Sequence, residues 1–439
     1  MDAIKLLLSY SLILLISLFT TTSITYAQSG NHGITLIYTG NLDGELEPCG
    51  CSEGGNKGGI KRQVKKIDEL RAEEPNLFLI SSGGLLISEM PQDKLKSEYI
   101  LKGLAATNYD AIGIQWKDLA FGKAFLNKHK LPFVISNSSN SDFLHSQLVK
   151  KKNSTLAFFS WLDTSGSSMA SMHDKLVNGD TEKLKTELTK AKKQSRLTVL
   201  STTYTLKQAQ KKLPLDDVDI LIIRAKYELY GEPQKTGKTL VIQPGSRGMR
   251  LGKLSLQVNK SGNIDAWRHE VIALPPEVDD SPRMADWYDE YNTKVKEQYE
   301  KSVAIRKAME SGESPFAGEQ TCANCHKKAY ETWSGTRHAE AFYSLQDAGK
   351  AFDPNCIGCH TVGFNQQGGF IDSVISENLM HVQCENCHGA GKAHADSAGH
   401  KPVANKDWSA EQICGQCHVQ KHSPDFNFET YWPKIKHGK

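Results

Sequence analysis

Four copies of Cys-x-x-Cys-His near the end of the chain constrain its fold more than any other feature. They run from Cys322 to His326, Cys356 to His360, Cys384 to His388 and Cys414 to His418. Eight of the 10 cysteines follow residue 321, and ten of the 15 histidines follow residue 325. The chemistry of the protein is therefore concentrated in its last quarter.

The motif is the one that attaches haem c. Its two thiols bond the two vinyl groups of a porphyrin, and the histidine that follows offers its imidazole to the iron. Two Cys₄ zinc ribbons are the alternative, but they would leave the four histidines unexplained. The sequence predicts four covalently bound haem c groups. Their attachment residues are Cys322, Cys325, Cys356, Cys359, Cys384, Cys387, Cys414 and Cys417, and their first iron ligands are His326, His360, His388 and His418.

The second iron ligands come from a small set. Met380 is the only methionine after residue 309, so at most one haem has His/Met ligation. Six histidines remain for four irons, which favours bis-His haems of low potential because they lack the methionine that raises it. The predicted ligands are drawn from His338, His394, His437, His422 and His381, with His400 the sixth histidine of the set.

Residues 1–27 have the pattern of a secretory signal peptide. Lys5 supplies the positive charge, residues 6–19 are mostly apolar, and Ala27 ends a segment suitable for cleavage. The mature protein is predicted to be periplasmic or secreted, where cysteines are oxidised or otherwise occupied. A short uncleaved anchor is the alternative, and only it would associate the protein with a membrane.

Residues 28–275 alternate short apolar runs with amphipathic segments, which is typical of an α/β domain. The expected strands are 34–38, 77–81, 133–136, 156–161, 197–201, 220–223 and 240–242. The expected helices are 59–73, 92–107, 119–128, 181–195 and 206–213.

A charged segment, residues 276–316, is expected to be a helical connector to a domain formed by residues 317–439. The whole chain has 53 Lys and Arg against 50 Asp and Glu, a net charge of +3. So small an excess, without a basic stripe interleaved with aromatic residues, argues against a nucleic-acid partner.

The C-terminal motifs resemble the cytochrome c554 family of tetrahaem electron carriers. The resemblance covers residues 316–439 and includes Arg337-His338-Ala339 and the Gly-Ala-Gly that follows His388. It implies a mainly α-helical tetrahaem domain in which His338 and His394 bind haems other than their nearest in sequence. It also implies a five-coordinate haem at His360, open to a small ligand such as nitric oxide. Whether His381 or Met380 closes that face is left open.

Residues 33–273 resemble the metallophosphatase domain of 5'-nucleotidases, through Thr39 to Gly44, Ser81 to Gly84 and Val241 to Gly245. The metal-ligand positions of that family are replaced. They hold Asn41, Asp43, Gly84, Gln115-Trp116-Lys117, Thr202 or Thr203, and the histidine-free stretch 224–230. Two-metal hydrolysis needs carboxylates and imidazoles around both cations, so we expect an α/β metallophosphatase-like sandwich without phosphatase activity.

Cys49 and Cys51 are the two cysteines outside the haem motifs. With one residue between them they could staple a loop, form a strained disulfide, bind a metal or act as a redox pair. The sequence does not choose among these roles.

Together these features predict a multihaem c-type cytochrome that carries low-potential electrons between redox partner proteins. One alternative is a haem enzyme acting on small nitrogen compounds, such as nitric oxide or hydroxylamine, at a five-coordinate haem. Another is a haem module of an extracellular electron conduit. The oligomeric state, including a homo-oligomer, is left open.

Overall fold

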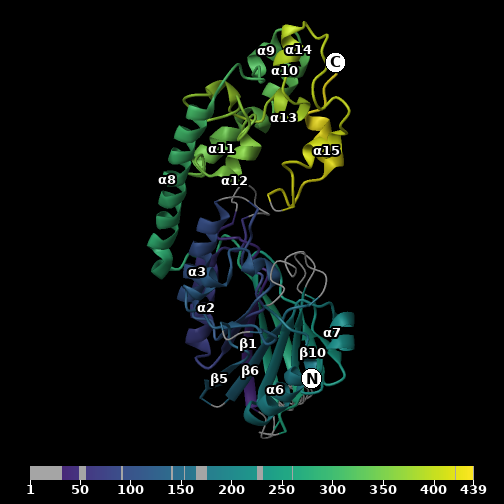
Figure 1. Cartoon of the computed structure of the whole chain (residues 1–439). Coiled ribbons are helices and arrows are strands. Elements are labelled where there is room, and N and C mark those ends of the chain that lie inside the picture. Colours follow the sequence, from purple (N-terminus) through teal and green to yellow (C-terminus); the bar gives the residue numbers. More distant parts are fainter. Residues whose placement is uncertain are drawn as a thin grey trace, which may run out of the picture.

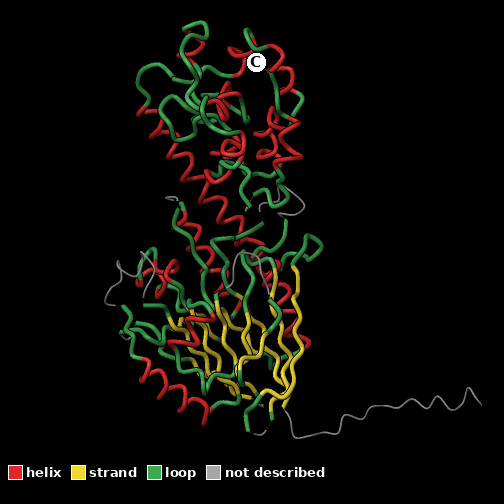
Figure 2. The backbone as a smooth tube through the Cα atoms, turned by 90° about the vertical axis from the view of Figure 1, so that its right-hand side faces the viewer, coloured by secondary structure: helices red, strands yellow, loops and turns green. Residues whose placement is uncertain are grey.

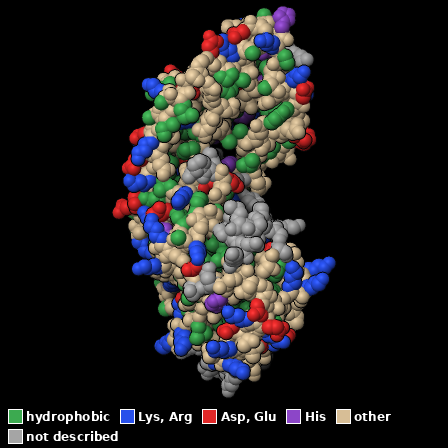
Figure 3. Space-filling model, in the orientation of Figure 1, with side chains coloured by type: hydrophobic (Ala, Val, Ile, Leu, Met, Phe, Trp, Pro, Cys, Tyr) green, Lys and Arg blue, Asp and Glu red, His purple; other side chains and the backbone are tan. Residues whose placement is uncertain are grey.

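The computed structural model describes residues 32–48, 56–89, 92–139, 142–152, 154–164, 176–224, 231–259, 261–420 and 422–438. The predicted signal peptide and Cys49-Gly50-Cys51 lie outside the described residues. The chain forms two lobes, and the long helix α8 (Ala285–Met309) runs along one side of the second (Figure 1). On the opposite side the surface is hollowed between the lobes (Figure 3).

The N-terminal lobe contains two six-stranded sheets. The first has the order β12-β11-β1-β2-β3-β4, in which β1 to β4 are parallel and β11 and β12 antiparallel. The second has the order β5-β6-β7-β8-β10-β9, with a parallel centre and antiparallel edges. The strands of the first sheet are β1 (His32–Thr39), β2 (Phe78–Ser81), β3 (Ala111–Gly113), β4 (Phe133–Val134), β11 (Arg250–Val258) and β12 (Ile264–Ala273). Those of the second are β5 (Gln147–Lys151), β6 (Ser154–Trp161), β7 (Leu197–Thr202), β8 (Ile220–Ile223), β9 (Gln234–Thr236) and β10 (Thr239–Ile242).

The two sheets pack face to face. Alternate residues of their central strands, among them Leu36, Ile80 and Phe158, form one buried cluster between them. The residues that point the other way pack against helices, because buried parallel strands are apolar on both faces. The first sheet is covered by α2 (Ile60–Glu73), α3 (Asp93–Thr107), η1 (Trp116–Leu119) and α4 (Lys123–Asn127), and the second by α6 (Thr181–Gln194) and α7 (Leu206–Lys212).

The seven predicted strands all occur, and five further strands, β3, β5, β9, β11 and β12, were not predicted. β3 and β9 are very short, and β12 alternates poorly because most of its residues are exposed. The single helix predicted over residues 119–128 is wrong. It is divided into η1 and α4, because Gly122 has a φ of 81°, which no helix continues.

The C-terminal lobe is built from short helices and loops, and the strands are confined to the other lobe (Figure 2). The predicted fold class, an α/β region followed by a mainly helical one, is confirmed. After η2 (Pro282–Met284) and α8, the α-helices are α9 (Glu319–Ala323), α10 (Lys327–Ser334), α11 (Ala341–Asp347), α12 (Pro354–His360), α13 (Cys384–His388), α14 (Lys392–Asp396), α15 (Ala410–Cys414) and α16 (Phe428–Tyr431). The 3-10 turns are η3 (Arg337–Glu340), η4 (Glu377–Leu379) and η5 (Trp432–Lys434).

Helix α8 connects the two lobes by contributing to both cores. Tyr291 and Val295 belong to the cluster under the first sheet, whereas Tyr299 belongs to the core of the C-terminal lobe. The turn before α12 adds a second contact. Phe352 packs against the N-terminal cluster, and Lys350 Nζ donates to Tyr288 Oη and, over 3.1 Å, to Asn292 Oδ1.

Candidate haem centres

The four Cys-x-x-Cys-His motifs lie on or beside short helices of the C-terminal lobe. The second and third motifs fall within α12 and α13, the first begins in α9, and the fourth begins at the end of α15. The eight cysteines of these motifs take part in no disulfide. A helical turn brings the two sulfurs of each motif onto one side, the arrangement that two thioether bonds to one porphyrin edge require.

Three motif histidines face a second histidine ring across a similar distance. The ring centroids are 6.1 Å apart for His326 and His394, 6.1 Å for His338 and His418, and 5.9 Å for His388 and His437. Two metal–nitrogen bonds of about 2 Å on opposite sides of an iron, plus the two ring radii, give about 6 Å. These spacings match imidazoles on the two faces of one haem.

The hydrogen bonds of two of these rings, His394 and His437, leave one ring nitrogen free to bind iron. Nδ1 of His394 lies 2.7 Å from the Lys401 carbonyl oxygen, and Nδ1 of His437 lies 3.0 Å from that of Ile435. A carbonyl can only accept, so each Nδ1 carries the proton and Nε2 keeps its lone pair. Ligating histidines are typically oriented in this way.

Electrostatics also favour neutral rings. Burial lowers the pKa of His338, and the nearby His418 and His360 lower it further. Partial desolvation by the surrounding chain likewise lowers the pKa of His388, with His437 as the largest charged contributor. A neutral imidazole is the form that binds a metal.

His360 differs from the other three motif histidines. Its Nδ1 donates over 2.6 Å to the carbonyl oxygen of Ala341, so its Nε2 is oriented for iron, yet no second histidine ring in the described part of the chain faces it. Met380 is buried in the core of the lobe and pairs through its backbone with Thr361.

His381, a predicted second ligand, faces no other histidine ring among the described residues. Its ring contacts that of Tyr343, with centroids 4.6 Å apart, and its Nδ1 accepts from the backbone N–H of Phe342 over 3.2 Å. Burial lowers the pKa of His381 as well, so the ring is neutral and carries its proton on Nε2. That protonation is the opposite of what ligation through Nε2 needs. The structure also does not bring His422 against a second histidine ring among the described residues.

Contacts between motifs indicate how the centres are arranged. The sulfurs of Cys322 and Cys384 lie close enough together to perturb each other's pKa, as do those of Cys359 and Cys417. His388 is close enough to His326 and His394 for their charges to lower its pKa after the larger effect of burial. The first and third motifs are therefore neighbours, and so are the second and fourth.

The last part of the C-terminal lobe lacks a buried core of its own. From residue 386 to 438 no described residue is buried, although this stretch includes His388, His394, His437 and the whole fourth motif. A folded segment of this length without a core of its own requires another source of apolar surface. Porphyrins held by the motif cysteines would supply it, so the residues present fit haem c.

Sequence reasoning missed two residues that hold the motifs together. The buried carboxylate of Glu385, inside the third motif, accepts from the backbone N–H groups of Ala317, Gly318 and Gly391 over 2.6 to 3.1 Å. The Gln383 side chain bonds Glu319 N as well as the Asn378 and Met380 carbonyl oxygens. The available signal was the charge of Glu385 inside a short motif that is expected to pack against haem. A charged residue in such a place is rarely buried without hydrogen-bond partners.

In the N-terminal lobe, the residues at the expected metal-ligand positions lie at the carboxyl ends of the parallel strands and bond to one another. Gln115 Nε2 donates over 2.8 Å to Asn41 Oδ1, and Lys117 forms an ion pair with Asp43. The described residues contain no group of three His, Cys, Asp or Glu side chains able to hold a metal. Of the stretch 224–230, only Arg224 is described.

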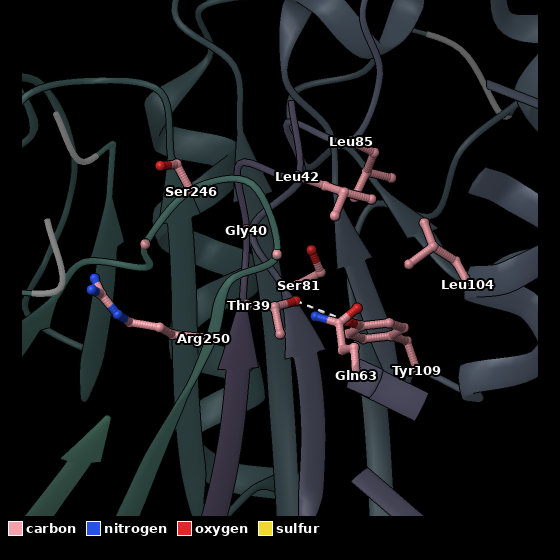
Figure 4. A pocket seen from close by; sticks show the side chains of 12 residues that line it. Thr39, Gly40, Leu42, Gln63, Ser81, Leu85, Leu104, Tyr109, Ser246 and Arg250 are labelled. Carbon is pink, nitrogen blue, oxygen red and sulfur yellow. Dashed lines mark hydrogen bonds between the residues drawn. The ribbon is translucent and has the colours of Figure 1, made fainter. Parts of the chain in front are cut away.

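A small cavity is lined in part by Gly40 and Leu42, the sequence neighbours of Asn41 (Figure 4). Its volume is about 10 Å³, and it is lined by Thr39, Ser81, Tyr109 and Ser246 among others, with Thr39 Oγ1 3.0 Å from Tyr109 Oη. Such a cavity holds about one water molecule and no nucleotide.

These features are those of a multihaem c-type cytochrome module, and the comparisons support this reading of the C-terminal lobe. Residues 321–389 match the family described as "Cytochrome c554 and c-prime". The region is also similar to cytochrome c-554 of Nitrosomonas europaea, with 31% identity over 140 residues, covering 25% of this chain and 60% of that relative. The chain therefore spans about 60% of the length of this curated relative. The resemblance seen in the motifs is confirmed, and it supports covalently bound haem c.

The N-terminal lobe shares its fold with metallophosphatase-like enzymes. The sulfate thiohydrolase SoxB of Thermus thermophilus aligns with a TM-score of 0.51 and 14% identity, over 60% of each chain. A 5'-nucleotidase precursor from Thermus thermophilus aligns with a TM-score of 0.50 and 14% identity, over 72% of this chain and 68% of that one. At this identity the likeness concerns the fold alone. In the part of the chain that the structure describes, no helix is both long and apolar enough to cross a bilayer.

Proposed function

We propose that this protein is a tetrahaem c-type cytochrome that carries electrons between redox partner proteins outside the cytoplasm. The observation that carries the proposal is the set of three imidazole pairs spaced 5.9 to 6.1 Å apart, each including one motif histidine. Bis-His ligation gives low-potential haems, since it lacks the methionine that raises the potential. The signal-like N-terminus supports a periplasmic or secreted location.

The contacts between motifs support a path for these electrons. The first motif lies near the third at Cys322 and Cys384, and the fourth lies near the second at Cys417 and Cys359. Cys387 and Cys414 are close enough to interact electrostatically, which links the two pairs. Electrons would therefore pass in the order first, third, fourth, second haem.

At the end of this path, the haem of the second motif is a candidate ligand-binding site. His360 is the one motif histidine without a facing imidazole among the described residues, and His381 directs Nδ1 to a backbone N–H instead. A five-coordinate iron here would bind a small ligand such as nitric oxide. Reduction of that ligand is the second candidate function.

The N-terminal lobe would serve docking or assembly and not hydrolysis. Asp43 and Lys117 neutralise one another where metal-dependent hydrolysis needs anionic and imidazole ligands. The lobe is attached to the turn before α12, so it lies nearest the haem of the second motif.

One pair of measurements on the purified protein tests the proposal. A pyridine haemochrome assay should give four haems per chain, and low-temperature electron paramagnetic resonance should give three low-spin signals and one high-spin signal. Fewer than four haems would overturn the tetrahaem assignment. Four low-spin signals, with no change on adding nitric oxide, would leave electron transfer and remove the ligand-binding function.

A further inference from the structure

Two histidines bind the two ends of one peptide group at the start of α11. The carbonyl oxygen of Ala341 accepts from His360 Nδ1 over 2.6 Å. The N–H of Phe342, which belongs to the same peptide, donates over 3.2 Å to His381 Nδ1. The peptide therefore joins the proposed iron ligand His360 to a histidine that faces no other imidazole in the described part of the chain.

The direction of both bonds is fixed by the backbone. A carbonyl oxygen only accepts and an amide N–H only donates, so His360 Nδ1 carries a proton and His381 Nδ1 does not. The His381 Nδ1 lone pair accepts from the Phe342 N–H. At the other end of the same amide, the Ala341 carbonyl oxygen accepts from the His360 Nδ1–H. All of the dipoles point the same way.

Hydrogen bonds aligned in such a chain strengthen one another. An amide whose N–H is engaged carries more negative charge on its oxygen, and the strengthening is estimated at about 10–30% per bond. A stronger bond from Nδ1–H makes a ligating imidazole more basic toward its metal. A more basic axial ligand favours the ferric state and lowers the potential of the haem.

We propose that His381 is a positioning residue that raises the electron density on the iron of the second motif through the Ala341–Phe342 peptide. The inference rests on the proposed function, in that haem c is bound at Cys356, Cys359 and His360. By this relay His381 would keep the potential of the ligand-binding haem low and its iron–histidine bond strong.

Ser344 supplies a built-in test of this relay. Its Oγ donates over 2.7 Å to the same Ala341 oxygen that accepts from His360. The hydroxyl competes for the electron density that His381 helps to supply. Removing His381 and removing Ser344 should therefore shift the haem potential in opposite directions. His381 also accepts a bond from the first turn of α11, but the loss of that bond alone would not produce opposite shifts.

The experiment compares His381→Leu, Ser344→Ala and the native holoprotein. Its readouts are the iron–histidine stretching frequency of the ferrous high-spin haem, by resonance Raman, and the midpoint potential of that haem, by spectroelectrochemistry. His381→Leu should lower the frequency and shift the potential positive, and Ser344→Ala should do the reverse. His400→Leu is the matched control, because His400 is exposed and has no part in the relay, and it should change neither.

The outcomes separate the relay from the function on which it rests. Four haems with unchanged frequencies in both variants, or shifts of the same sign, would overturn the relay alone. A native protein without a haem at the second motif, or without a high-spin ferrous signal, would overturn the ligand-binding haem and the relay with it. If His381→Leu does not accumulate as folded protein, the direction of the Ser344→Ala shift still decides.

Discussion

The two lobes of this molecule are stabilised in different ways. In the N-terminal lobe, three buried apolar clusters fill the space between the sheets and beneath the helices on either side. In the C-terminal lobe, one small cluster surrounds α11 and α12, and residues 386–438 contain no buried described residue. The first lobe can fold from its own side chains, whereas the second needs the haems that its motifs attach.

The same contrast extends to the candidate sites. In the N-terminal lobe, Gln115 bonds Asn41 and Lys117 pairs with Asp43 beside a core that is complete without them. In the C-terminal lobe, the motif residues that would hold haem lie in a stretch with few buried side chains, so the same groups would carry the chemistry and hold the chain together.

The sharpest way to break this comparison is to prepare the chain without haem. Expression without a haem-attachment system should leave the C-terminal lobe unfolded and the N-terminal lobe intact. Only the C-terminal lobe would lose the apolar surface that holds it together. In hydrogen exchange, amides of residues 386–438 should exchange at the rate of an unfolded chain, while β6 and β7 stay protected. Protection of α13 to α15 in the haem-free chain would contradict the account.

Substitution of the facing histidines tests the same lobe one haem at a time. His394→Ala and His437→Ala should each convert one low-spin haem to high spin, raising the high-spin share from about one haem in four to two. Electron paramagnetic resonance measures this share directly. His422→Ala is the control and should leave it unchanged. A fully low-spin His394→Ala spectrum would show that the pairing with His326 is not ligation.

Each lobe also contains a buried carboxylate that accepts several backbone N–H groups, and these form a matched pair. Asp118 accepts from Gly84, Leu85, Leu86 and Gln115, and Glu385 accepts from Ala317, Gly318 and Gly391. Conversion of either carboxylate to its amide leaves buried N–H donors facing an NH₂ group. This should lower the free energy of unfolding by about 3 kcal/mol. Asp118→Asn should lower the stability of the N-terminal lobe with or without haem. Glu385→Gln should lower the stability of the C-terminal lobe in the holoprotein and have no effect on the haem-free chain. Urea titrations of both forms measure this difference.

The sequence allowed prediction of the parts of the structure that depend on local patterns. The seven apolar runs became strands, and the haem motifs needed only their spacing. The pairing of His326 with His394, or of His338 with His418, depends on how distant helices pack, and no local pattern contains that information. The role of His381 also required the structure, because a histidine that serves a backbone N–H and one that binds iron have the same side chain.

The smallest predicted effect concerns pH and the N-terminal lobe alone. Burial raises the pKa of Glu47 to about 7, an effect that Lys61 partly offsets. Between pH 4.5 and 7 the folded chain therefore binds more protons than the unfolded chain, so the stability of the lobe falls as the pH rises through this window. Each pKa unit corresponds to about 1.4 kcal/mol, and solvent near this partly exposed side chain reduces the total to about 2 kcal/mol.

Glu47→Gln should abolish this slope, because a glutamine stays neutral as the protonated glutamate does. The free energy of unfolding of the variant minus that of the native lobe should grow from near zero at pH 4.5 to its full value above pH 7. Glu73→Gln, at an exposed position on α2, controls for the general effect of removing a negative charge. A Glu47→Gln difference independent of pH would mean that folding does not shift the pKa of this carboxyl group. The measurement belongs on the haem-free chain, where the first lobe unfolds without a contribution from the second.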